Sequence, residues 1–246
     1  MTSETMPGNR EAMPKLLARI TFSRHEETNY TGIGRDITDR GVERARMKGR
    51  AIAKEKGAPV FYAHSPRERA RGTAESIAEG VQEALGDDRA AFWMESPGLR
   101  STDFYDEEFR THLQEVLGDS QEAWAKAHYN RPEYYNNPGK LETNEDRRAR
   151  LYDEMGKLLR FLEKQETQDE VPHLVFVSHY ELITLFLDDV FGINAIGGPD
   201  APTFGEHIDI DVQRPLPNGD VPMQVHYNGH TQRVVFDRQL RRVVAP

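Results

Sequence analysis

Short apolar runs alternate along the chain with segments whose apolar residues recur at helical spacing. The runs that predict buried strands lie at 16–23, 59–63 and 174–177, with a weaker one at 91–94. The segments with helical spacing lie at 38–56, 65–86, 143–165 and 180–191. This alternation predicts an α/β fold, a three-layer α/β/α sandwich with a mainly parallel sheet.

Polar residues mark the starts of these helices. Thr38 is a suitable N-cap for the first one. The pairs with the three-residue offset of a capping box are Ser65 with Glu68 and Thr143 with Asp146. Pro66 would then stand at the first helical position, so we expect a helix to begin there.

The alternation breaks down in two places. Residues 97–140 contain three prolines, many tyrosines and asparagines, and one helical patch at 107–117, so we expect an inserted subdomain of helix and loop. Near the C-terminus, the runs at 203–212, 221–227 and 232–236 are separated by turn-forming residues and predict an antiparallel edge of the sheet. We expect residues 1–15 to be a disordered polar leader and 16–246 to form one domain.

Composition narrows the function. The 246 residues include 41 acidic and 32 basic ones, and the net charge of −9 argues against a nucleic-acid partner. No cysteine is present, which excludes disulfides, thiolate nucleophiles and cysteine zinc sites. No run of about 18 apolar residues occurs, so we expect no membrane partner and a cytoplasmic protein.

Polar side chains follow three of the predicted strands. Arg24 and His25 follow the first, Ser65 follows the second with Arg69 one helical turn on, and His179 follows a later one. In open α/β sheets, ligands bind beyond the carboxyl ends of the strands. Two histidines and two arginines beside a helix N-terminus predict a pocket for a phosphate dianion.

Several segments resemble the ordered motifs of one family. Four of them resemble these family motifs: SRHEETN at 23–29 resembles Arg-His-Gly-Glu-Thr; DITDRGVERA at 36–45 resembles D-x-x-L-T-x-x-G-x-x-Q-A; SPRERARGTA at 65–74 resembles S-P-L-x-R-A-x-x-T-A; and Glu142-Thr143 with Arg147 resembles G-E-S…R. The fifth, VSH at 177–179, resembles the motif of the second histidine. The chain therefore resembles branch 1 of the histidine phosphatase, or phosphoglycerate-mutase-like, superfamily over about residues 17–192.

The resemblance implies a phosphatase that acts on a small phosphorylated metabolite and needs no metal or cofactor. It implies that His25 is the nucleophile and forms a phosphohistidine that water hydrolyses, which suits an imidazole that is largely neutral at pH 7. Arg24 and Arg69 match the phosphate-clamping arginines, His179 the second pocket histidine, and Asn29 a further contact. A phosphomutase of the same family and a non-catalytic phosphate-binding or interaction protein stay open, as does a homodimer.

The positions directly after the two histidines depart from the family pattern. Glu26 follows the nucleophile where the family has glycine, and Tyr180, a substrate-binding candidate, follows the second histidine where glycine is common. A carboxylate about 4 Å from a phosphate oxygen costs about 4 kcal/mol at an effective dielectric of 20. Glu26 must therefore point away from the phosphate, or the site is impaired or altered. If it does face the pocket, we expect it to repel phosphate rather than to donate a proton.

The proton donor is the remaining question. The family's usual acid is a glutamate two residues after a leucine, but here Ser101 holds that place after Leu99. Asp103 is the predicted donor. Glu181, two residues past His179, is the alternative and a second substrate-binding candidate. Either carboxyl would have to be protonated to serve as an acid.

Other polar and aromatic residues have simpler explanations. Structural, exposed roles are expected for His64, Arg67 and Arg71. A metal-binding face or, as we favour, a half-exposed strand accounts for Glu206, His207, Asp209 and Asp211. We expect the aromatic residues of the insertion to form its small core or else to contact a ring of the substrate; they are Trp124, Tyr129, Tyr134 and Tyr135.

Overall fold

A computed structural model describes residues 15–29, 35–54, 60–86, 92–118, 123, 137–165, 171–192 and 201–246. Its strands are β1 (Leu16–Arg24), β2 (Val60–His64), β3 (Phe92–Glu95), β4 (His173–Ser178), β5 (His207–Gln213), β6 (Val221–Tyr227), β7 (His230–Asp237) and β8 (Arg242–Val244). Its helices are α1 (Asp39–Ala53), α2 (Glu68–Leu85), α3 (Glu107–Leu117), α6 (Asn144–Gln165) and α7 (Tyr180–Phe191), with a 3₁₀ turn, η1, at Pro97–Leu99.

The strands form one sheet in the order β3-β2-β4-β1-β5-β6-β7-β8. Strands β1 to β4 pair in parallel, and β5 to β8 join the other side of β1 as an antiparallel series. The predicted parallel sheet with an antiparallel C-terminal edge is therefore confirmed. Strand β8 was not predicted, because its three residues are too few to display an alternating pattern.

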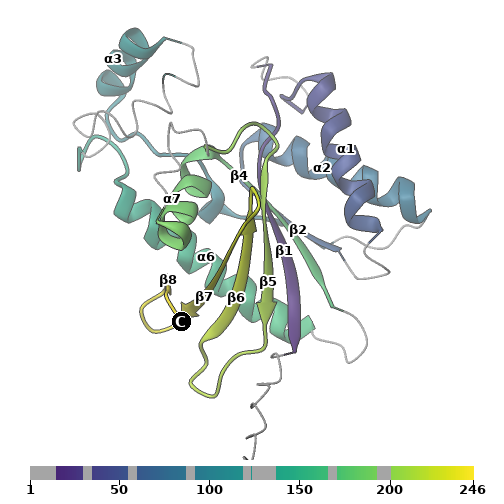
Figure 1. Cartoon of the computed structure of the whole chain (residues 1–246). Coiled ribbons are helices and arrows are strands. Elements are labelled where there is room, and N and C mark those ends of the chain that lie inside the picture. The colour runs from purple at the N-terminus through teal and green to yellow at the C-terminus, as the bar shows by residue number, and fades with distance from the viewer. Residues whose placement is uncertain are drawn as a thin grey trace, which may run out of the picture.

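Helices cover both faces of the sheet (Figure 1). The central strand β4 is buried along its whole length, and its side chains alternate between two cores. Val175 and Val177 pack with α1 and α2, whereas Leu174 and Phe176 pack with α6 and α7. Each fully buried side chain of this size contributes about 1.5–3 kcal/mol to folding. The predicted three-layer sandwich is confirmed.

Two glycines bring α1 and α2 into backbone contact. A Cβ atom on Gly49 would lie 2.0 Å from the Ile77 carbonyl oxygen, and one on Gly80 would lie 2.0 Å from that of Arg46. Larger side chains at either position would push the helices apart. This contact fixes α2, whose first turn carries Arg69, relative to the sheet.

The helix starts test three of the capping predictions. Thr38 caps α1 through the Gly41 N–H at 3.1 Å, and the Thr143 hydroxyl accepts the Asp146 N–H at 3.1 Å, as predicted. The capping box at Ser65 is wrong. Helix α2 begins only at Glu68, after Arg67, and no side chain caps it.

The predicted insertion is described in part. Helix α3 has the predicted bounds, and Asp106 caps it through the Phe109 N–H at 3.0 Å. Phe109, Leu113 and Leu141 form a small core of their own. Figure 1 shows α3 beyond the edge of the sheet at which β1 ends. Some predictions concern residues outside the described part of the chain. These are the predictions on the leader, residues 1–14, and on the aromatic residues Trp124, Tyr129, Tyr134 and Tyr135.

None of the described helices is both long and apolar enough to cross a bilayer.

Candidate active site

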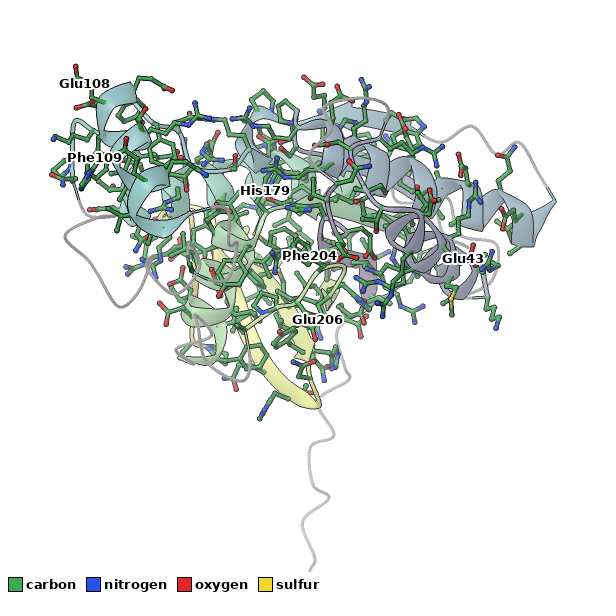
Figure 2. The ribbon with its side chains drawn as sticks, turned by 90° about the horizontal axis from the view of Figure 1, so that it is seen from above. Glu43, Glu108, Phe109, His179, Phe204 and Glu206 are labelled. Atoms are coloured by element: carbon green, nitrogen blue, oxygen red, sulfur yellow. The ribbon has the colours of Figure 1, made fainter. Side chains whose placement is uncertain are left out.

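The carboxyl ends of three neighbouring strands bring the predicted residues together. His25 follows β1, Ser65 follows β2 and His179 follows β4, and β4 lies between the other two strands. The His25 N–H donates to the Ser178 carbonyl and the Ser65 N–H to the Val177 carbonyl, each at 3.0 Å. Figure 2 looks down on this edge and shows His179 near the middle of the view.

Arg69 bridges the two histidines. Its Nε donates to His25 Nε2 at 3.2 Å, and its Nη2 lies 3.5 Å from His179 Nδ1. The two imidazole rings meet edge to face with their centroids 5.1 Å apart. Sequence analysis placed these three side chains in one pocket, and the structure brings them into contact.

The hydrogen bonds determine the tautomer of His25. A guanidinium can only donate, so His25 Nε2 presents its lone pair to Arg69. His25 Nδ1 lies 2.8 Å from the Glu26 carbonyl oxygen, which can only accept, so Nδ1 carries the proton. The ring nitrogen that faces Arg69 is therefore the one with a lone pair available for attack.

Burial and neighbouring charge keep both histidines neutral. Desolvation, followed by the positive charges of Arg69 and Arg24, holds the pKa of His25 well below its ordinary value, although the hydrogen bond to Glu26 opposes the shift. Burial, then His25 and Arg69, lower the pKa of His179 in the same direction. An unprotonated imidazole is the form that can act as a nucleophile.

Two aromatic rings enclose the Arg24 guanidinium. Its central carbon lies 4.0 Å from the ring centroid of Phe204 and 5.0 Å from that of Tyr180, within the range of cation–π attraction. Arg24 Nη1 donates to the Pro202 carbonyl at 2.7 Å. Tyr180 thus supports an arginine of the pocket, and it is buried.

Three residues of this site were not predicted in these roles. Ser65 Oγ lies 2.7 Å from His179 Nε2 and accepts the Arg67 N–H at 3.2 Å, so it positions the imidazole instead of capping a helix. Thr73 Oγ1 accepts the Glu26 N–H at 2.9 Å. Phe204 lies in a short turn-rich segment with no periodicity, and nothing in the sequence signalled its contact with Arg24.

His64 corrects a further expectation. We expected an exposed side chain, but His64 is buried, with 5% of its surface exposed. Its Nδ1 lies 2.9 Å from the Ser65 carbonyl oxygen. Arg67 and Arg71 are exposed, as predicted. His64 ends a strand that has neighbours on both sides, and its ring meets Trp93 of β3 with centroids 6.2 Å apart, a contact that its isolated position in the sequence did not reveal.

The Glu26 carboxylate does not contact the two histidines. It is buried and forms an ion pair with Arg44 of α1. Of the two arrangements left open, the structure favours the one in which Glu26 points away from the phosphate over the one in which it faces the pocket and repels phosphate. Arg44 is 18 residues from Glu26 in sequence, so adjacency to His25 gave no indication of the pairing.

The remaining predicted residues are Asp103, Glu181 and Asn29. Asp103 accepts from Arg100 Nε at 2.5 Å, and its backbone joins Glu142 through the Glu142 N–H at 2.9 Å. Glu181 is partly buried in the first turn of α7. Asn29 is exposed, and its Nδ2 donates to the Ile37 carbonyl at 3.4 Å.

The acidic segment before and along β5 is a half-exposed strand. Ile208, Ile210 and Val212 are buried, and the polar residues between them point away from that core. Among the described residues, no group of three or more histidine, aspartate or glutamate side chains could hold a metal ion.

Comparisons with known proteins identify a family for the chain. Residues 20–202 match the family described as histidine phosphatase superfamily (branch 1). No curated protein sequence matches the chain.

Solved structures share the fold. A mycobacterial glucosyl-3-phosphoglycerate phosphatase matches with a TM-score of 0.53 and 15% identity over 79% of this chain and 90% of that one. A phosphoglycerate mutase from Bacillus anthracis str. Sterne matches with a TM-score of 0.52 and 16% identity over 87% and 90%. At such low identity, these likenesses concern the fold alone.

Proposed function

The chain belongs to branch 1 of the histidine phosphatase superfamily, and on that premise we propose that it hydrolyses a small phosphate monoester through a phosphohistidine on His25. One observation carries the proposal. A buried, neutral His25 is held with its Nδ1 proton on a backbone carbonyl and its Nε2 lone pair beside the Arg69 guanidinium. This arrangement suits a nucleophile adjacent to a site for anionic oxygens.

Substrate binding would begin with a change of partner at Arg69. Its Nε donates to the lone pair that has to attack, so it must be drawn away first. A phosphate oxygen is a charged acceptor and forms a stronger hydrogen bond with a guanidinium than a neutral imidazole does. Arrival of the phosphate group would thus both clamp the substrate and release His25 Nε2.

Phosphoryl transfer would then take place in two steps. The His25 Nε2 lone pair forms a bond to phosphorus as the bond to the leaving oxygen breaks, and that oxygen takes a proton from an acid. Arg24 and Arg69 stabilise the charge on the equatorial oxygens. Water next attacks phosphorus and gives a proton to the carboxylate left by the first step, the bond to Nε2 breaks, and inorganic phosphate leaves with His25 neutral and the acid protonated again. The Nδ1 hydrogen bond to the Glu26 carbonyl supports the ring while it carries positive charge.

We propose Asp103 as the proton donor, with Glu181 as the alternative. Asp103→Asn is expected to lower turnover of an alkyl phosphate by about 100-fold, because a positioned acid contributes about that much. Turnover of p-nitrophenyl phosphate should change little, since its phenolate leaves without a proton. The same alkyl-selective loss in Glu181→Gln, with Asp103→Asn unaffected, would transfer the role to Glu181.

We expect activity to survive exhaustive chelation with EDTA. Two arginines supply the positive charge that a metal would otherwise provide at phosphorus. Phosphate release is measured before and after chelation. Loss of activity that a divalent ion specifically restores would contradict this mechanism and direct attention to His207, Asp209 and Asp211.

A panel of phosphorylated metabolites tests the proposed function directly. Release of inorganic phosphate from purified protein identifies both the activity and the leaving group. Transfer of the phosphoryl group to a second substrate, without release, would instead establish a mutase. Binding without turnover of any ester would establish a phosphate-binding protein.

A further inference from the structure

The charged side chains of Glu26, Arg44 and Lys48 form an ionic cluster that takes no part in the mechanism above. The Glu26 side chain is buried, although a carboxylate is costly to bury unless it is paired. Arg44 Nη2 donates both to Glu26 Oε2 and to the Phe204 carbonyl. Lys48, one turn further along α1, donates through Nζ to the Gly205 carbonyl at 2.5 Å and to Ser23 Oγ at 2.8 Å.

These contacts hold the segment that precedes β5. Gly205 lies directly against the Glu26 carboxylate, because a Cβ atom there would be 2.1 Å from Glu26 Oε1. Its N–H donates to the His25 carbonyl at 3.2 Å, and its φ of +72° is one that glycine adopts readily. The Phe204 carbonyl and the Gly205 backbone are therefore tied to α1 and to the loop that carries His25.

The position of Phe204 matters for the phosphate site. Its ring contacts the Arg24 guanidinium, as described, and its centroid lies 5.7 Å from that of His25. The Pro202 carbonyl of the same segment accepts from Arg24 Nη1. The plane of the Arg24 guanidinium is thus set by the segment that Arg44 and Lys48 hold.

Charge balance explains why the carboxylate is needed. Burial lowers the pKa of Lys48 to about 8, and the negative charge of Glu26 is the largest influence that opposes this shift. Without Glu26, Arg44 would lose its buried carboxylate partner, and Lys48 would keep only the weaker influences of Asp209 and Glu206. In the family pattern, glycine stands at the position of Glu26 and glutamine at that of Arg44, so the ion pair joins two departures from one pattern.

We propose that Glu26 is a positioning residue. Through Arg44 and Lys48 it holds residues 202–205 against the His25 loop, so that Phe204 orients Arg24 toward a bound phosphate. This role deepens the proposed function, on which it rests for the identity of the anion. A positioning role predicts that removing the Glu26 charge weakens phosphate binding, whereas a repulsive carboxylate would predict tighter binding.

A double-mutant cycle tests the proposal through vanadate affinity, which is measured without turnover. Glu26→Gln and Phe204→Ala are each expected to weaken vanadate binding by about tenfold. Since Glu26 acts through Phe204, the double variant should bind no more than about twofold more weakly than Phe204→Ala alone. A purely structural contribution of Glu26 would not depend on the Phe204 ring.

Glu43→Gln is the matched control. Glu43 precedes Arg44 on α1 but is exposed and pairs with Arg50 at 2.5 Å (Figure 2). The Glu43→Gln variant should bind vanadate with the affinity of the wild type. Should Glu26→Gln fail to fold, Arg44→Gln replaces it in the cycle, because the Arg44 side chain is 38% exposed and its loss is easier to accommodate.

The outcomes are distinct. Unchanged or tighter binding in a folded Glu26→Gln, or effects that multiply to about 100-fold in the double variant, would overturn the positioning role. Failure of the wild type itself to bind vanadate would instead overturn the proposed function.

Discussion

Alanine at position 25 is expected to abolish phosphate release from every ester that the wild-type protein hydrolyses, by at least about 10⁴-fold in kcat. The chain has no cysteine that could replace the nucleophile, and the two nitrogens of His179 already face Ser65 and Arg69. The fold should survive, because the substitution removes a polar ring and not a residue of the apolar cores. Turnover and a thermal melt of the same sample are the measurements.

His226→Ala is the control for this variant. His226 lies on β6 with its side chain 38% exposed, and β5 separates β6 from β1 in the sheet. We expect its turnover to match the wild type. A folded His25→Ala protein with wild-type rates would refute a nucleophilic role for His25.

Arg69→Ala should have the second largest effect, a loss of about 10³-fold in kcat/KM. A guanidinium that stabilises charge in phosphoryl transfer contributes that much or more. Arg69→Lys should recover little, because an ammonium cannot present the two nitrogens that face His25 Nε2 and His179 Nδ1. Full recovery with lysine would show that charge alone is needed.

The pH profile of the Arg69 variants gives an independent result. The positive charge of Arg69 helps to lower the pKa of His25, so its removal should raise that pKa toward the ordinary value. Protonation of His25 inactivates the nucleophile, and the acidic limb of kcat/KM should therefore move to higher pH in Arg69→Ala than in Arg69→Lys. An acidic limb at the same pH in both variants would mean that Arg69 does not act on His25.

Much of the site could be predicted because strand ends are visible in the sequence. The apolar runs stop at Arg24, Ser65 and Ser178, and parallel strands necessarily bring such ends to one edge. Helix boundaries were predictable where a cap and a periodic pattern coincide, as at Thr38. The three-residue offset between Ser65 and Glu68 matched a capping box, but the Ser65 hydroxyl forms its hydrogen bond with the buried His179 imidazole instead. The sequence pattern does not reveal that partner.

The direction of the Glu26 side chain could not be predicted, because its partners come from distant segments. Arg44 belongs to the next helix, and Gly205 lies 179 positions away from Glu26 in sequence. The antiparallel pairing of β5 with β1 brings Gly205 beside the loop that carries His25. Phe204 gave no signal for the same reason, since its contact with Arg24 depends on that long-range pairing.

The most direct test of the mechanism is to trap the phosphoenzyme. The wild-type protein is mixed with ³²P-labelled p-nitrophenyl phosphate, quenched in alkali, which preserves phosphohistidine, and digested with trypsin. The mechanism predicts an acid-labile label on the peptide that begins at His25, after cleavage at Arg24, and no such label in His25→Ala. A label on any other residue, or continued turnover with no labelled protein, would contradict it.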